Sequence, residues 1–166
     1  MAIKEIPNNP EAEQAVIGSM FLEKNALQKA CEVLTPEAFY FNNNAKIFGT
    51  IKDMAEKKVP IDLTTVTSYL KNRNELSEVG GVEYLTEILD SVATAANIDQ
   101  YVKLVEESAL LRKLIEVSTN ITTTAYSSDK SVNETIDDAE RKILSVVKNR
   151  RSSEFRTIKD VLIQTQ

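Results

Sequence analysis

The residue types that carry out most enzyme chemistry are scarce in this chain. It contains no histidine, which excludes general-base catalysis by imidazole, Ser–His triads and histidine metal ligands. The single cysteine, Cys31, lies in an apolar segment and is expected to be a small core residue, not a nucleophile. The four glycines form neither G-x-x-x-x-G-K-[ST] nor G-x-G-x-x-G, so no phosphate-binding loop is encoded. The sequence therefore predicts no catalytic, metal or cofactor site.

The charged groups that could replace histidine stand on segments predicted to be helical. Glu106 and Glu107 are neighbours in sequence, as are Asp137 and Asp138, so on a helix their side chains diverge and form a solvated face. A basic cluster further along consists of Lys148, Arg150, Arg151 and Arg156. These positive charges either complement the C-terminus of a helix or contact nucleic acid or another partner.

Composition points to an all-α protein. Hydrophobic residues make up 42% of the 166 residues, which is enough for a core, while glycine and proline number four each. The net charge of −5 provides no global field that attracts nucleic acid. A lone cysteine suits a cytoplasmic protein, and the sequence contains neither a run long enough to span a membrane nor a signal peptide.

A long helical hairpin is predicted over residues 97–151. Neither glycine nor proline occurs from Ile98 to Tyr126, so nothing interrupts a helix there. Residues 126–130 break the pattern, and Ser131 with Glu134 has the spacing of a capping box that begins a second helix. Because the connection is short, we expect the two helices to be antiparallel.

The first helix of this hairpin carries more apolar surface than one partner helix can cover. One stripe consists of Leu110, Leu114, Val117 and Ile121. The other consists of Leu104, Leu111, Ile115, Ser118, Thr122 and Ala125. The predicted core face of the second helix is Val132, Ile136, Ala139, Ile143 and Val146. Either the rest of the chain or a second copy must cover the surplus. We favour a second copy, with a dimer interface formed by Leu104, Leu111, Ile115, Ser118 and Thr122.

Residues 1–96 are predicted to form a head of five or six short helices. Gly18 lies within the first of these and suggests a close crossing with another helix. Residues 42–44, three asparagines, are expected to be a loop or cap before a helix over 45–57. After Arg151, the pair Ser152–Ser153 is expected to break the chain before a linker helix begins within 152–166. The apolar face of this segment has no predicted partner here, so we expect the chain to be a piece of something longer.

Six blocks resemble, in the same order, the bacterial replicative DNA helicases of the DnaB family. They are residues 11–18 (EAEQAVIG), 34–40 (LTPEAFY), 59–64 (VPIDLT), 79–85 (VGGVEYL), 94–98 (TAANI) and 138–143 (DAERKI). Residues 158–165 (IKDVLIQT) are similar to the linker helix of that family. The resemblance covers essentially the whole chain.

This resemblance implies an N-terminal collar domain that is not catalytic. Hairpins would pair between subunits, and three such dimers would form a collar over a hexameric ring of RecA-like ATPase domains. ATP and Mg²⁺ would bind in the ATPase domain, beyond the linker helix, so no cofactor is expected in these residues. The implied partners are a second copy, the C-terminal domain of primase, a helicase loader and, in the complete ring only, DNA.

The resemblance also suggests binding residues. Primase would dock where head and hairpin meet, on Glu11, Tyr84, Leu114, Ile115 and Ile121. A second interpretation makes Tyr84 a core residue. The linker helix would dock on a neighbouring ATPase domain through Ile158, Val161 and Leu162.

Two other functions are open on the residues alone. The first is a free-standing helical adaptor that modulates a helicase or its loader, which the helicase-like residues 158–165 argue against. The second is a helical enzyme that uses carboxylates only, which the absence of converging acidic residues disfavours.

Overall fold

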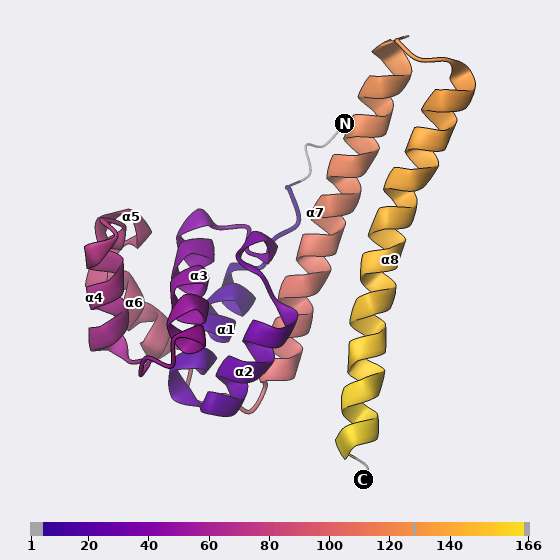
Figure 1. Cartoon of the computed structure of the whole chain (residues 1–166). Helices are drawn as coiled ribbons and strands as arrows, with labels where there is room; N and C mark the ends of the chain where they lie inside the picture. Colours follow the sequence, from indigo (N-terminus) through magenta and orange to yellow (C-terminus); the bar gives the residue numbers. More distant parts are fainter. Residues whose placement is uncertain (1–4, 128, 165–166) are drawn as a thin grey trace. The chain divides into compact units, whose positions relative to one another are not determined.

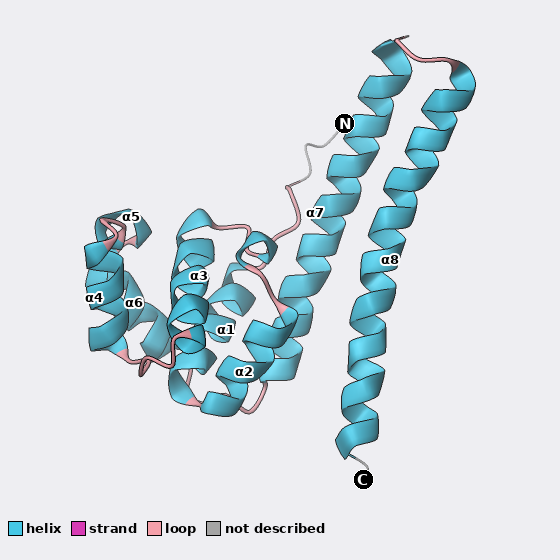
Figure 2. Cartoon of the chain, in the orientation of Figure 1, coloured by secondary structure: helices cyan, strands magenta, loops and turns pink. Residues whose placement is uncertain are grey.

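The computed structural model describes residues 5–127 and 129–164, excluding the side chains of residues 149–161 and 164. Throughout these described residues the regular secondary structure is helical, which confirms the predicted all-α class (Figures 1 and 2). The elements are α1 (Pro10–Leu22), α2 (Lys24–Val33), the 3-10 helix η1 (Pro36–Ala38), α3 (Asn42–Glu56), α4 (Leu63–Asn72), α5 (Leu76–Val79), α6 (Gly81–Ser91), α7 (Ile98–Ser127) and α8 (Val132–Gln164).

The chain divides into two compact units. The head unit is Pro7–Ala109, and the hairpin unit contains Leu110–Gln166. Helix α7 passes from the first unit into the second, and Ile98, Val102 and Val105 in its first turns belong to the core of the head unit. The predicted boundary between head and hairpin at residue 97 stays a prediction. None of the helices in the described residues is long and apolar enough to cross a membrane.

Capping residues fix where the first and fourth helices of the head begin. The Asn9 side chain accepts a hydrogen bond from the backbone N–H of Ala12 at 2.9 Å, and Pro10 occupies the first turn of α1. At α4, the Asp62 carboxylate accepts from the Thr65 N–H at 2.8 Å while the Thr65 hydroxyl accepts from the Asp62 N–H at 3.0 Å. This reciprocal pair is a capping box that fixes the start of α4.

Helix α1 crosses α6 at Gly18, which confirms the predicted close approach. A Cβ atom at position 18 would lie 2.6 Å from Cγ2 of Val92 and 3.0 Å from the carbonyl oxygen of Ile88. The crossing is therefore possible because residue 18 has no side chain. The packing between the end of α6 and the middle of α1 outweighs the cost of a glycine within a helix, which is about 1 kcal/mol relative to alanine.

Helix α3 begins three residues earlier than predicted. The three asparagines form its first turn, because the Ala45 N–H already donates to the carbonyl oxygen of Phe41 at 2.9 Å. Asparagine disfavours helices when its side chain bonds to the nearby backbone. Here the Asn44 amide donates instead to the Glu13 carboxylate at 2.9 Å, so it does not compete with the helix.

The predicted break at Ser152–Ser153 is wrong, since α8 continues without interruption to Gln164. Serine costs a helix only about 0.5 kcal/mol relative to alanine, and neither glycine nor proline occurs between residues 132 and 164. Residues 158–164 therefore follow the second arm of the hairpin within one helix.

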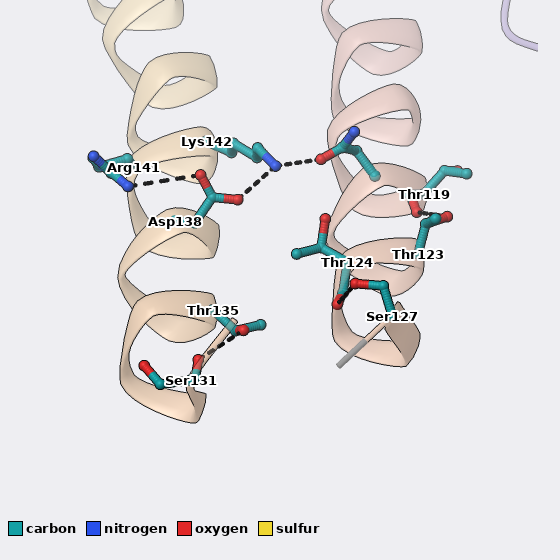
Figure 3. Close-up of polar contacts among 10 residues, drawn as sticks. Thr119, Thr123, Thr124, Ser127, Ser131, Thr135, Asp138, Arg141 and Lys142 are labelled. Carbon is teal, nitrogen blue, oxygen red and sulfur yellow. Dashed lines mark hydrogen bonds and ion pairs between the residues drawn. The ribbon is translucent and has the colours of Figure 1, made fainter. Parts of the chain in front are cut away.

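Helices α7 and α8 of the hairpin unit lie side by side and antiparallel, as predicted (Figure 1). The Ser131 hydroxyl accepts from the Glu134 N–H at 3.2 Å and so caps the start of α8. The Lys142 ammonium donates to the Asn120 side chain on α7 and to Asp138 at 2.7 Å (Figure 3). This contact joins the two arms, and Val117 on α7 and Val146 on α8 are each less than a tenth exposed.

The structure corrects the predicted core face of α8. Val146 is buried, but Val132, Ile136 and Ile143 are 74%, 51% and 37% exposed. Lys142, which reaches Asn120 on α7, lies on the side of α8 that faces α7, whereas Val132, Ile136 and Ile143 are not covered by that helix. An apolar stripe on α8 therefore stays open in the single chain.

The Gly18 crossing leads to a stability prediction. We expect Gly18→Ala to lower the free energy of unfolding by about 1–3 kcal/mol, because the new methyl group overlaps Val92. Gly49→Ala is the matched control on α3. A Cβ atom there would meet only Pro36 Cγ at 3.4 Å, so improved helix propensity should raise stability by about 0.5–1 kcal/mol. Urea titrations of the three proteins measure both effects, and equal effects at the two glycines would contradict the close crossing.

Candidate partner-binding surfaces

The residues considered for chemistry do not converge in the structure. The Cys31 thiol packs partly against the core, where burial raises its pKa more than the nearby Lys52 ammonium lowers it. Asp138 is engaged by Lys142, whose hydrogen bond is the largest cause of the lowered pKa of that carboxyl. Among the described residues, no group of three or more histidine, cysteine, aspartate or glutamate side chains could hold a metal ion.

Helix α7 carries an apolar stripe that is not covered in the single chain. Leu111 and Ile115 are 51% and 47% exposed, although leucine and isoleucine are among the most often buried residue types. Ser118 and Thr122 continue the stripe toward the end of the helix and are also exposed. Leu104, one of the predicted dimer residues, lies in the head unit and packs partly against its core, so less of its side chain is open.

Hydroxyl groups on this end of α7 bond to the helix itself. The Thr122 hydroxyl donates to the Ser118 carbonyl at 2.9 Å. Figure 3 shows the similar bond from the Thr123 hydroxyl to the Thr119 carbonyl, at 3.0 Å. A threonine whose hydroxyl is satisfied in this way can present its methyl group to a neighbour. The end of the stripe is thus less polar than its sequence suggests.

The predicted primase residues fall into two groups, one in each unit. In the head unit, Glu11 is exposed in the first turn of α1, while Tyr84 on α6 is half-buried. In the hairpin unit, Leu114 is 40% exposed, Ile115 lies on the open stripe, and Ile121 is half-buried. Of the predicted linker-helix residues, Leu162 is 61% exposed, and the side chains of Ile158 and Val161 lie outside the described residues.

Tyr84 ends a buried chain of hydrogen bonds. Its hydroxyl donates to the Asn44 side-chain oxygen at 2.5 Å and accepts from the Gln14 amide at 3.3 Å. The Asn44 amide in turn donates to the Glu13 carboxylate at 2.9 Å. Glu13 also accepts from the backbone N–H groups of Tyr40 at 2.8 Å and Phe41 at 3.4 Å. The network joins α1, the segment before α3, α3 itself and α6.

Glu13 and Asn44 are functional candidates that the sequence did not reveal. Glu13 is 2% exposed, although an acidic residue in the first turn of a helix is ordinarily a solvated charge that favours the positive helix N-terminus. Asn44 is 1% exposed but stands among three asparagines typical of a loop. No local pattern distinguishes these buried polar residues from their exposed neighbours, because their partners are 27 or more residues away.

The described residues form an all-helical head with its own core and a helical hairpin whose first arm carries an open apolar stripe. Residues 5–107 match the family model described as the DnaB-like helicase N terminal domain. The chain belongs to this family. A relative from Bacillus subtilis (strain 168), the replicative DNA helicase DnaC, is 46% identical over 96% of this chain, and DnaB of Geobacillus stearothermophilus is 43% identical over 96%. The chain spans 35% of the length of each of these two relatives.

Solved structures show the same fold. The N-terminal domain of DnaB helicase from Mycobacterium tuberculosis superposes with a TM-score of 0.80 at 34% identity, covering 85% of this chain and 99% of that one. A DnaB-like replicative helicase, whose structure was described with its interactions with primase, matches with a TM-score of 0.70 at 26% identity. That match covers 91% of this chain and 35% of the helicase.

Because Glu13 is buried and accepts several donors, its charge should matter far more than that of its neighbour. Glu13→Gln replaces an acceptor by an NH₂ group facing other donors and should destabilise the chain by about 1–3 kcal/mol. Glu11→Gln, in the same helical turn and exposed, should cost less than about 0.5 kcal/mol. Chemical denaturation compares the two, and similar losses would show that the network contributes nothing beyond the helix dipole.

Proposed function

We propose that this chain is the N-terminal assembly domain of a replicative DNA helicase, which pairs with a second copy through α7 and docks primase. The observation that carries the proposal is the open stripe on α7, where Leu111 and Ile115 are about half exposed. Burying each of these side chains is worth about 1.5–3 kcal/mol. In a symmetric dimer each residue is buried twice, so the stripe can supply a substantial part of a self-association energy.

A second copy is the occupant favoured by the composition of the stripe. Exposed apolar residues of α7 are followed by the small residues Ser118 and Thr122, which allow two helices to approach closely. The stripe on α8, with Val132 and Ile136, offers a second apolar surface of the same hairpin unit. A pair of hairpins could therefore bury surfaces from both arms.

The proposed activity of the whole protein extends beyond these residues. The relatives that the chain matches are replicative DNA helicases, and the chain corresponds to about a third of their length. We assign ATP hydrolysis, Mg²⁺ binding and contact with DNA to a further ATPase domain, and the arrangement of three dimers in a collar to the complete hexamer. The identities of 46% and 43% to helicases favour this assignment over a free-standing adaptor of a helicase or its loader.

We assign primase docking to a head surface and a hairpin surface. The head surface contains Glu11 and the half-buried ring of Tyr84, and the hairpin surface contains Leu114, Ile115 and Ile121. Both combine an aromatic or aliphatic anchor with polar neighbours, as binding hot spots do. The described interaction of a DnaB-like helicase with primase, at 26% identity to this chain, supports the choice of partner. The linker residues Ile158, Val161 and Leu162 are assigned to docking on the ATPase domain of a neighbouring subunit.

Self-association is tested by charging the stripe. The double variant Leu111→Asp with Ile115→Asp should sediment as a monomer at concentrations where the wild type is dimeric, since each carboxylate would be buried without a partner. Arg141→Asp changes the net charge by the same two units at a side chain on α8 that is 76% exposed, and should stay dimeric. A wild type that is monomeric at high micromolar concentration would refute the assignment.

Primase docking is tested on each surface separately. Tyr84→Ala and Ile121→Asp should each weaken binding to the C-terminal domain of the cognate primase by more than about tenfold, equivalent to about 1.4 kcal/mol. Titration calorimetry gives the affinity, and thermal melts of the same samples report stability. If Tyr84→Ala lowers the melting temperature but leaves binding intact, Tyr84 is a core residue and the head surface is wrongly assigned.

A further inference from the structure

We propose that Asn44 is a positioning residue for the head docking surface, where its side chain holds the ring of Tyr84 in the orientation that the partner meets. This inference rests on the proposed docking of primase at Tyr84. Asn44 itself is 1% exposed, so it acts through Tyr84 and does not touch the partner.

The direction of each hydrogen bond in the network is dictated by the Glu13 carboxylate. An ionised carboxylate only accepts, so the Asn44 NH₂ group must face it, at 2.9 Å. The Asn44 oxygen then faces α6 and accepts from the Tyr84 hydroxyl at 2.5 Å. The Tyr84 oxygen is left to accept from the Gln14 amide, at 3.3 Å. Flipping the Asn44 amide would set its oxygen against the Glu13 carboxylate, acceptor against acceptor, so the amide has one favoured orientation.

Glu13 is itself held in place from several directions. It is 2% exposed and accepts from the backbone N–H groups of Tyr40 and Phe41 in addition to Asn44. A buried carboxylate persists only when donors surround it, so its position is tightly specified. The orientation of the Asn44 amide, and through it that of the Tyr84 hydroxyl, is therefore fixed by a carboxylate that two consecutive backbone N–H groups hold in place.

The other end of Tyr84 is constrained by Gly80. A Cβ atom on Gly80 would lie 2.7 Å from the Cβ atom of Tyr84, and Gly80 has a φ of +112° that side chains disfavour. Tyr84 is thus closely packed at its base and hydrogen-bonded at its tip. Since its hydroxyl is already satisfied within the head, the part of the ring left for a partner is apolar.

The state of the hydroxyl agrees with this geometry. Burial is the largest cause of the raised pKa of Tyr84, with the hydrogen bonds to Gln14 and Asn44 acting in the opposite direction. The phenol therefore stays protonated at neutral pH and can donate to Asn44. A partner meets a ring whose orientation is fixed before binding, which lowers the entropy lost on association.

A double-mutant cycle tests whether Asn44 acts through Tyr84. The full chain and its Asn44→Ala, Tyr84→Ala and doubly substituted variants are titrated with the C-terminal domain of the cognate primase, below the melting temperature of each. Asn44→Ala should weaken binding about threefold or more in the wild type and have no further effect once Tyr84 is alanine. Asn43→Ala is the matched control. It is the preceding asparagine, and its side chain accepts a hydrogen bond from the backbone N–H of Asn44. Because the hydrogen bonds of the Tyr84 hydroxyl go to Asn44 and Gln14, removing the Asn43 side chain should leave binding unchanged.

Each outcome separates this inference from the function on which it rests. Equal weakening by Asn44→Ala in the presence and absence of the Tyr84 ring, or none in either, overturns the positioning role while docking at Tyr84 stands. If Tyr84→Ala binds the primase domain as tightly as the wild type does, the docking assignment itself is wrong. Should Asn44→Ala not fold, Tyr84→Phe keeps the ring and removes the same hydrogen bond. It should weaken binding to a similar extent, and unchanged affinity overturns the proposal.

Discussion

A single neighbouring helix cannot cover a helix that is apolar on two adjacent faces, and α7 is such a helix. Its first turns supply Ile98, Val102 and Val105 to the head core, and further along Val117 is buried in the hairpin unit. The stripe with Leu111 and Ile115 is covered only in part, since each of these side chains stays about half exposed. The proposals that a second copy is the missing neighbour and that the chain is an assembly domain both rest on this surplus of apolar surface.

The register of the two hairpin arms depends on a polar contact, whereas the sequence suggested a seam of apolar residues. Lys142 reaches Asn120 on the opposite arm and Asp138 on its own, which places a charged face of α8 toward α7. A fully apolar seam would tolerate several registers, whereas a buried or bridging polar group favours one. The consequence is an open α8 stripe around Val132 and Ile136, which adds to the surface available for assembly.

In the head as well, a buried polar group, the Glu13 carboxylate, favours one arrangement of the helices. This carboxylate is nearly inaccessible to solvent and is surrounded by donors from Tyr40, Phe41 and Asn44, so removing any partner would leave a charge or a donor unsatisfied. Because Tyr84 belongs to the same network, a residue assigned to binding is also part of what defines the fold. The two interpretations of Tyr84, core and contact, are therefore not exclusive.

Features with local causes could be predicted from the sequence. The uninterrupted α7 was expected because neither glycine nor proline occurs in it, and the close crossing was expected from a single glycine within a helix, Gly18. The open stripe of α8 and the burial of Glu13 and Asn44 were missed because they depend on contacts between distant residues. The break expected at Ser152–Ser153 failed for another reason, since serine is a weak helix breaker.

The central claim, that the outward stripe of α7 pairs with a second copy, can be measured by electron paramagnetic resonance. A nitroxide on Ser118→Cys, in a Cys31→Ser background, places one probe on the stripe of each chain. The account predicts an intermolecular dipolar signal with a narrow distance distribution that disappears when labelled chains are diluted into excess unlabelled chain. A signal that is absent at high micromolar concentration, or that does not change on dilution, would contradict it.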